Sequence, residues 1–108
     1  MEKRVVITGL GAITPVGIGK ENFYNALLEG KSGIGPITRF DASDYATRIA
    51  GEVKDFDITQ YGVDKKEARR MDRSVEFAIG AAVLAADDAK LALDEEDLDR
   101  CGTVVGTG

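Results

Sequence analysis

The residues of this sequence best suited to chemistry are four cations within six positions, Lys65, Lys66, Arg69 and Arg70. We call them the basic cluster. They stand out because the chain is acidic, with 19 Asp and Glu residues against 14 Lys and Arg and a net charge of -5. Lys66, Arg69 and Arg70 are spaced i, i+3, i+4, so a single helical turn would place all three on one face.

Two interpretations of the basic cluster remain open from the residues alone. A focused positive patch on an acidic protein can steer an anionic partner to its binding site. The cluster can equally be a solvated helix start that pairs with the nearby carboxylates of Asp64, Glu67 and Asp72. Taken without further information, the residues slightly favour the solvated helix start.

The chain offers no complete centre for nucleophilic catalysis. It has no histidine, so neither a Ser-His-Asp nor a Cys-His arrangement can be built. The single thiol, Cys101, follows five carboxylates between positions 94 and 99, and their charge disfavours the thiolate. We expect Cys101 to be a small, semi-buried residue that enters a strand. The sequence therefore predicts no catalytic residue.

The sequence departs from the known metal-binding and nucleotide-binding motifs. The carboxylates from Asp94 to Asp99 lack the spacing and central glycine of a calcium loop, and one thiolate with carboxylates is an unusual zinc set. Gly9-x-Gly11 follows a β-branched run, as in dinucleotide-binding folds, but the third glycine position is Thr14. Pro15 then disfavours the helix that the motif requires. We expect no metal and no cofactor, and Gly9-x-Gly11 is interpreted as a tightly packed turn.

The elements that must position these residues follow from periodicity and turn signals. Helices are predicted over 20–29 and 73–91, the second with an alanine-rich apolar stripe and Asp72 as its N-cap. Strands are predicted over 5–8 and 103–105, with a weaker candidate over 48–53. Residues 57–63 are predicted as a turn, and the glycine-rich run 9–19 is apolar enough to pack against a neighbour. Two β-branched strands joined by helices predict an α/β fold with a parallel sheet, of which two strands are too few to be complete.

Composition excludes several classes of protein. The negative net charge argues against a general nucleic-acid binder. No apolar run is long enough to span a bilayer, so we expect no membrane partner. One cysteine cannot form an internal disulfide, and the first residues carry no apolar signal segment. The cytoplasm is the predicted compartment.

Several of these segments together resemble the start of a type II β-ketoacyl-[acyl-carrier-protein] synthase. The resemblance runs from Arg4 to Gly108 and corresponds to only the opening portion of a member of that family. Four segments carry the resemblance. The first two are shared by condensing enzymes in general, and the third is specific to type II. The signatures are Val5–Gly17, Leu28–Ile34, Arg39–Tyr45 with Ile49–Phe56, and Arg69–Asp72.

This resemblance implies a fold, a reaction and an assembly. The fold is the thiolase-like layered αβαβα structure, usually a homodimer, and residues 1–108 would be an incomplete N-terminal segment of its first half. The reaction is elongation of fatty acyl chains by decarboxylative Claisen condensation with a malonyl-carrier protein. The family's nucleophilic cysteine and both histidines lie beyond Gly108, and Cys101 does not match the nucleophile's motif. The segment alone is therefore expected to be inactive.

The resemblance also implies roles for two groups of residues. Cations at the positions of Lys66, Arg69 and Arg70 help to dock the acidic acyl carrier protein in this family, and Lys65 is a plausible addition. This shifts the preference for the basic cluster from a solvated helix start to a docking site. Gly106, Thr107 and Gly108 resemble the opening of the acyl pocket. The competing hypotheses are a small non-catalytic module that binds an acidic protein partner and, on Gly9-x-Gly11 alone, a dinucleotide-binding enzyme.

Overall fold

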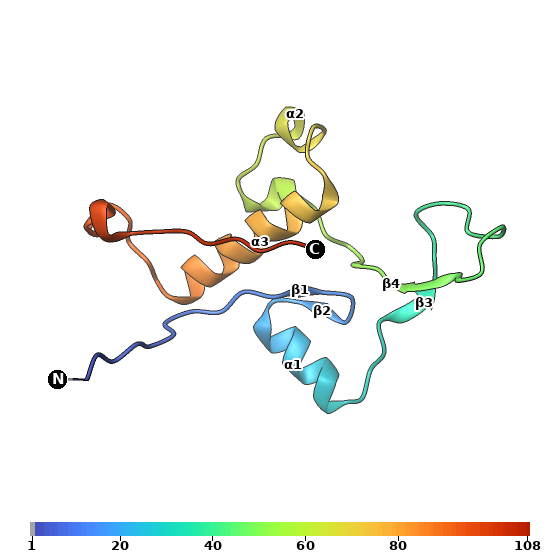
Figure 1. Ribbon diagram of the computed structural model, residues 1–108, viewed down its shortest axis with the longest axis horizontal. Coiled ribbons are helices and arrows are strands. Elements are labelled where there is room, and N and C mark those ends of the chain that lie inside the picture. The colour runs from blue at the N-terminus through green and yellow to red at the C-terminus, as the bar shows by residue number, and fades with distance from the viewer. Residues whose placement is uncertain (1) are drawn as a thin grey trace.

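The structure is a computed structural model that describes residues 2–108. It is an open α/β arrangement rather than a ball, with extents of 57 × 37 × 24 Å (Figure 1). The radius of gyration is 17.1 Å, whereas a compact domain of this length has one of about 13 Å. Much apolar surface consequently remains in contact with solvent.

Two helices form the frame, and both were predicted. Helix α1 spans Lys20–Leu28 and is followed by Gly30 at a φ of 69°, a left-handed conformation that glycine adopts without strain. Helix α3 spans Arg73–Asp88, with Asp72 at its N-cap position although the Asp72 side chain makes no capping hydrogen bond. Helix α3 ends three residues earlier than the apolar stripe suggested.

The strands form two short antiparallel hairpins. Strands β1 (Ile13–Thr14) and β2 (Gly17–Ile18) pair directly before α1, and β3 (Ile34–Pro36) pairs with β4 (Ile49–Gly51). The prediction of a strand over 48–53 is confirmed in β4. Its partner β3 has a composition typical of a loop, with glycine and proline around Ile34. The pairing with β4 makes this segment a strand.

The predicted parallel sheet is not formed within residues 2–108. The segments 5–8 and 103–105 are extended but belong to no strand, and Val5 and Val104 are 94% and 99% exposed. A strand exists only when its backbone groups find a partner, and neither segment pairs with another in this part of the chain. Figure 1 draws both as thin coil without arrows: the C-terminal segment passes across α3, whereas the N-terminal segment leads away from it.

A close backbone contact forms where the glycine-rich run crosses α3. A Cβ at Gly11 would lie 2.1 Å from the Ala81 carbonyl oxygen, so the two backbones are in direct contact. Gly9 approaches Ala85 in the same way, which confirms that this run packs against a neighbour. The alanine-rich stripe of α3 is what permits such a close approach.

Three smaller elements complete the chain. A 3₁₀ turn, η1 (Ile58–Tyr61), replaces the predicted turn at 57–63, and α2 (Lys65–Ala68) is a single helical turn. A second 3₁₀ turn, η2 (Leu98–Arg100), follows the acidic residues 94–97. Ile58, only 3% exposed, fixes η1 to the body of the protein beside α3, so η1 and the start of α3 form the base from which α2 projects (Figure 1).

Candidate functional site

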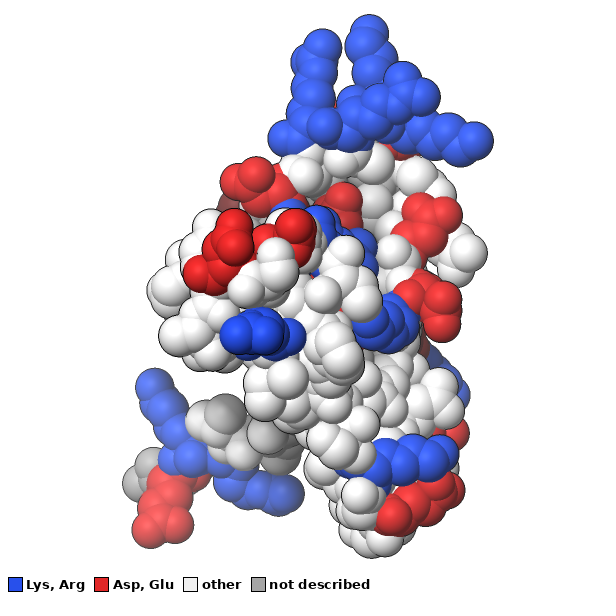
Figure 2. Space-filling model, turned by 90° about the vertical axis from the view of Figure 1, so that its right-hand side faces the viewer, with Lys and Arg blue, Asp and Glu red and all other residues white. Residues whose placement is uncertain are grey.

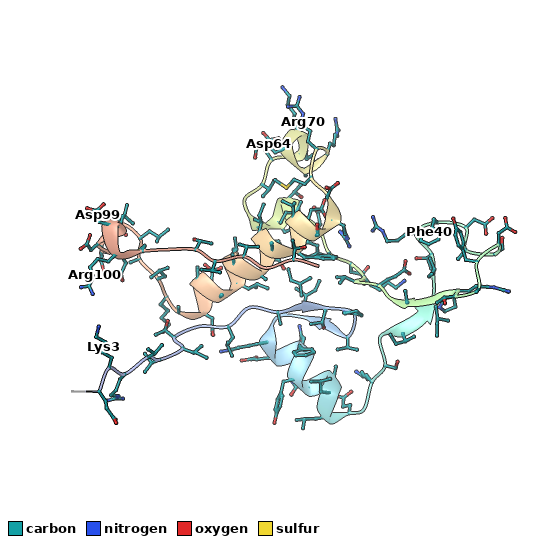
Figure 3. The ribbon with its side chains drawn as sticks, viewed as in Figure 1. Lys3, Phe40, Asp64, Arg70, Asp99 and Arg100 are labelled. Atoms are coloured by element: carbon teal, nitrogen blue, oxygen red, sulfur yellow. The ribbon has the colours of Figure 1, made fainter. Side chains whose placement is uncertain are left out.

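The basic cluster lies on α2 and the turn that follows it. Lys65 and Lys66 are within the helical turn, Arg69 is its C-cap residue, and Arg70 continues in a hydrogen-bonded turn to Glu67. All four cations are exposed. Figure 2 shows Lys and Arg side chains gathered over α2 at the top of the molecule, and Arg70 points away from the body in Figure 3. The predicted helical turn is therefore present, although α2 ends at Ala68 and Arg69 and Arg70 lie just beyond it.

The segment that carries the cluster, residues 57–72, is called the cluster loop below. Its shape depends on two aspartates that accept hydrogen bonds from nearby backbone amides. Asp57 accepts from the amide of Thr59 at 2.9 Å and caps η1, and Asp64 accepts from the amide of Lys66 and caps α2. Gly62, at a φ of 87°, makes the reversal between the two elements.

The cations of the cluster are not neutralised by neighbouring acids. Within residues 2–108, none of the four forms an ion pair, and Asp64, Glu67 and Asp72 form none either. This differs from the pairing that a solvated helix start would have used. The Thr59 hydroxyl and amide hold the pKa of Asp57 below its ordinary value, and the positive charge of Lys65 lowers it further. Lys65 thus acts on Asp57 through its charge without forming an ion pair with it.

The base of the cluster loop is held by Arg73, which the sequence did not single out. The Arg73 guanidinium donates to the carbonyl oxygens of Val53 and Phe56 and pairs with Glu76. The only sign of this role in the sequence is the i, i+3 spacing of Arg73 and Glu76, which permits an ion pair on a helix. The contacts of Arg73 with residues 53 and 56 could not be predicted, because only folding brings them together.

The second predicted site, Gly106, Thr107 and Gly108, lies at the exposed extended end of the chain. Val105, Gly106 and Thr107 border a hollow of about 300 Å³ against the first turns of α3. The helix contributes Ser74, Val75, Ala78 and Ile79 to this hollow. The wall is mostly apolar, as an acyl chain would require.

Cys101 differs from its prediction. It is exposed rather than semi-buried, and it follows η2 instead of entering a strand. Its thiol lies 3.4 Å from the carbonyl oxygen of Asp97. In the part of the chain that the structure describes, no three metal-ligating residues come together, and no helix has the length and apolar character needed to cross a bilayer.

Gly9-x-Gly11 faces a helix flank rather than a helix start. Both glycines lie against the backbone of the second half of α3, around Ala81 and Ala85. A pyrophosphate site would need these glycines directly before a helix N-terminus. Their small size serves backbone packing, so the interpretation as a tightly packed segment is confirmed, although the segment is extended rather than turned.

Comparison with known proteins supplies the family. The profile described as "Beta-ketoacyl synthase, N-terminal domain" matches residues 2–108. The chain belongs to the β-ketoacyl synthase family. The β-ketoacyl synthase segment is 57% identical over 107 residues to the 3-oxoacyl-[acyl-carrier-protein] synthase 2 of Synechocystis, a match that covers 99% of this chain and 26% of that relative. It is 48% identical to the Vibrio harveyi protein of the same name, again over 26% of that relative.

The structures agree with this assignment. The β-ketoacyl synthase segment superimposes on the ishigamide ketosynthase/chain length factor with a TM-score of 0.72 and 38% sequence identity. That match covers 83% of this chain and 22% of the other. The resemblance to the N-terminal part of type II synthases is thus confirmed, and the mixed α/β architecture is that of a ketosynthase N-terminal domain. The chain spans about a quarter of the length of the curated relatives it matches.

Proposed function

We propose that this chain is the N-terminal part of a 3-oxoacyl-[acyl-carrier-protein] synthase that elongates acyl chains by decarboxylative Claisen condensation with malonyl-carrier protein. In this proposal the segment contributes scaffold and carrier docking, while the nucleophile and its histidine partners lie elsewhere in the synthase. The absence of histidine from the sequence and the exposed position of Cys101 support that division. The full-length synthase is a cytoplasmic homodimer with the thiolase-like αβαβα fold.

The observation that carries the docking role is the unpaired state of the basic cluster. Four exposed cations project on one short loop of an acidic chain, and no carboxylate among residues 2–108 pairs with them. Cations held close together repel one another and produce a focused positive potential. An anionic partner is attracted by all of them at once and relieves this repulsion. An acyl carrier protein, which is acidic, is the partner that matches this charge.

The experiment replaces Lys66, Arg69 and Arg70 by Glu in the full-length synthase. Activity with a carrier-bound substrate should fall at least about tenfold at low salt, because three attractive charges become repulsive. Activity with a small thioester that needs no carrier should stay near that of the parent enzyme. The salt dependence of the carrier reaction should also weaken, since fewer ions are displaced on docking.

A charge-matched control separates docking from a general effect of net charge. Lys31, Arg39 and Arg48 are also exposed and lie on or beside the β3–β4 hairpin, away from α2 (Figure 1). Their triple replacement by Glu makes the same change in net charge and should leave the carrier reaction nearly unchanged. Equal losses in the two triple variants, or no loss in the cluster variant at low salt, would refute the docking role.

The hollow beside Val105, Gly106 and Thr107 is proposed as part of the opening of the acyl pocket. Its apolar wall on α3 supports this role. Replacement of Ala78 by Phe would place a bulky ring in the hollow and should shorten the longest acyl chain that the full-length synthase accepts. An unchanged chain-length profile would argue against the assignment.

A further inference from the structure

The Arg73 side chain contacts two backbone carbonyls, a carboxylate and two aromatic rings. One guanidinium nitrogen lies 3.0 Å from a Glu76 carboxylate oxygen and 3.3 Å from the Phe56 carbonyl oxygen. The other terminal nitrogen lies 3.3 Å from the Val53 carbonyl oxygen. The guanidinium carbon also lies 4.8 Å from the centre of the Phe77 ring and 5.4 Å from that of Phe56, within range for cation–π attraction.

These contacts join the two ends of the cluster loop. Val53 and Phe56 precede η1, where the loop begins, and Arg73 is the first residue of α3, where the loop has returned. Phe56 is 8% exposed and its ring lies 5.4 Å from that of Tyr61, the last residue of η1. Arg73 therefore closes a ring of contacts through Phe56 and η1 back to the start of α3.

The charge of Arg73 is compensated inside the protein, unlike the charges of the basic cluster. Glu76, whose side chain is 16% exposed, neutralises it, and the two carbonyl oxygens and two ring faces surround it. The Arg73 side chain is 27% exposed. Arg73 is poorly placed to bind an external anion. It can therefore affect docking only by positioning other residues.

We infer that Arg73 is a positioning residue for carrier docking: it clamps the base of the cluster loop and thereby sets the orientation of the basic cluster. This inference rests on the proposed docking function. The planar guanidinium reaches two carbonyl oxygens and a carboxylate from two nitrogens held in a fixed fork. An ammonium has three donors but only one nitrogen, and a thioether has no donor. A looser base widens the range of orientations that the cluster samples, and fewer of them match the carrier.

The test uses Arg73→Met and Arg73→Lys in the full-length synthase, assayed with carrier-bound substrate and with a small thioester. Arg73→Met should raise the KM for the carrier substrate by about three- to tenfold while kcat and the small-thioester reaction stay unchanged. The salt dependence of carrier KM should match that of the parent enzyme, because no docking cation is lost. The KM of Arg73→Lys for the carrier substrate should lie between the values of the parent enzyme and of Arg73→Met, since lysine keeps the charge but not the planar fork.

Two further measurements keep the result interpretable. Glu76→Gln removes the charge of the ion-pair partner but keeps the guanidinium, and it should also raise the KM for the carrier substrate. This variant replaces Arg73→Met in the test if Arg73→Met proves insoluble. Amide hydrogen exchange of residues 62–72 should accelerate in both variants. Arg48→Met removes one exposed cation on the distant hairpin and should change neither quantity.

The outcomes distinguish this inference from the docking proposal. Unchanged carrier KM in Arg73→Met and Glu76→Gln, together with a strong loss in the cluster variant, would overturn the clamp and leave docking intact. A parallel fall of kcat with both substrates would show that Arg73 only stabilises the fold. If the cluster variant itself docks normally, the docking proposal fails first.

Discussion

The close approach of Gly11 to the backbone of α3 leads to a specific prediction about its replacement. In the full-length synthase, Gly11→Ala should destabilise the packing of the glycine-rich run on α3. The new Cβ would lie 2.1 Å from the Ala81 carbonyl oxygen and 2.8 Å from the Ala85 amide nitrogen. Both atoms belong to the helix backbone, so neither can rotate away as the end of a side chain could.

The magnitude follows from the distance that must be recovered. Ordinary contacts of a Cβ begin near 3.4 Å, so the run must withdraw from α3 by roughly 1 Å. A gap of that size forfeits a quarter to a half of the dispersion energy of each atom pair along the contact. Overpacking of this kind costs about 3 kcal/mol. In a synthase about four times as long as this chain, an unfolding entropy of about 2.1 cal/mol/K per residue converts this cost to a Tm lower by roughly 3–4 °C.

Scanning calorimetry of the purified enzyme measures this loss, with Gly35→Ala as the matched control. Gly35 lies in β3, and a Cβ there would meet no atom within 4 Å. Its replacement should change the free energy of unfolding by less than about 0.5 kcal/mol. Equal Tm values for Gly11→Ala and the parent would refute the packing argument, because no flexible neighbour is available to absorb the methyl group.

Three further predictions concern packing, pH and the isolated chain. Gly80→Ala should cost less than Gly11→Ala, about 1 kcal/mol in the same calorimetry, because its Cβ would meet only the side-chain ends of Ile13 and Phe56, at 2.6 and 2.7 Å. The Thr38 hydroxyl holds the pKa of Glu52 below its ordinary value, so the stabilisation from this carboxylate is complete above the ordinary pKa and is lost as pH falls through the lowered pKa. Glu52→Gln should therefore unfold at a lower temperature than the parent at pH 7, and the difference should shrink as the pH falls through the lowered pKa of Glu52; a constant difference would contradict this. The isolated 108-residue chain should show no cooperative thermal transition and should bind an apolar dye, because side chains such as Val5, Ile7 and Val104 are exposed; a sharp transition from a monodisperse sample would contradict this.

Local signals in the sequence were sufficient for the helices and for the chemistry of the basic cluster. The 3.6-residue periodicity of α3 and the glycine after α1 are properties of neighbouring residues, so they survive without tertiary information. The cations were visible for the same reason. Family resemblance then favoured docking over a solvated helix start, and the family itself is confirmed by the match to residues 2–108.

Strand assignments were less accurate because a strand depends on its partner. The β-branched runs at 5–8 and 103–105 have the right composition, yet within residues 2–108 they pair with nothing. Conversely, β3 has poor strand composition but is held by β4 and by Glu52, which accepts hydrogen bonds from the amide and hydroxyl of Thr38 just beyond it. Pairing across the chain decided both cases, and composition could not.

The sequence by itself determined the family, the helices and the presence of four clustered cations in an acidic chain. Only the tertiary structure decided that these cations form no ion pair within residues 2–108, and that Arg73 joins Val53, Phe56 and Glu76 at the base of the loop that carries them. The physical reason is the distance along the chain over which each effect acts. Helix formation and charge clustering depend on residues three or four positions apart, whereas Arg73 reaches carbonyl groups 17 and 20 positions away, which only the folded backbone brings within hydrogen-bond range.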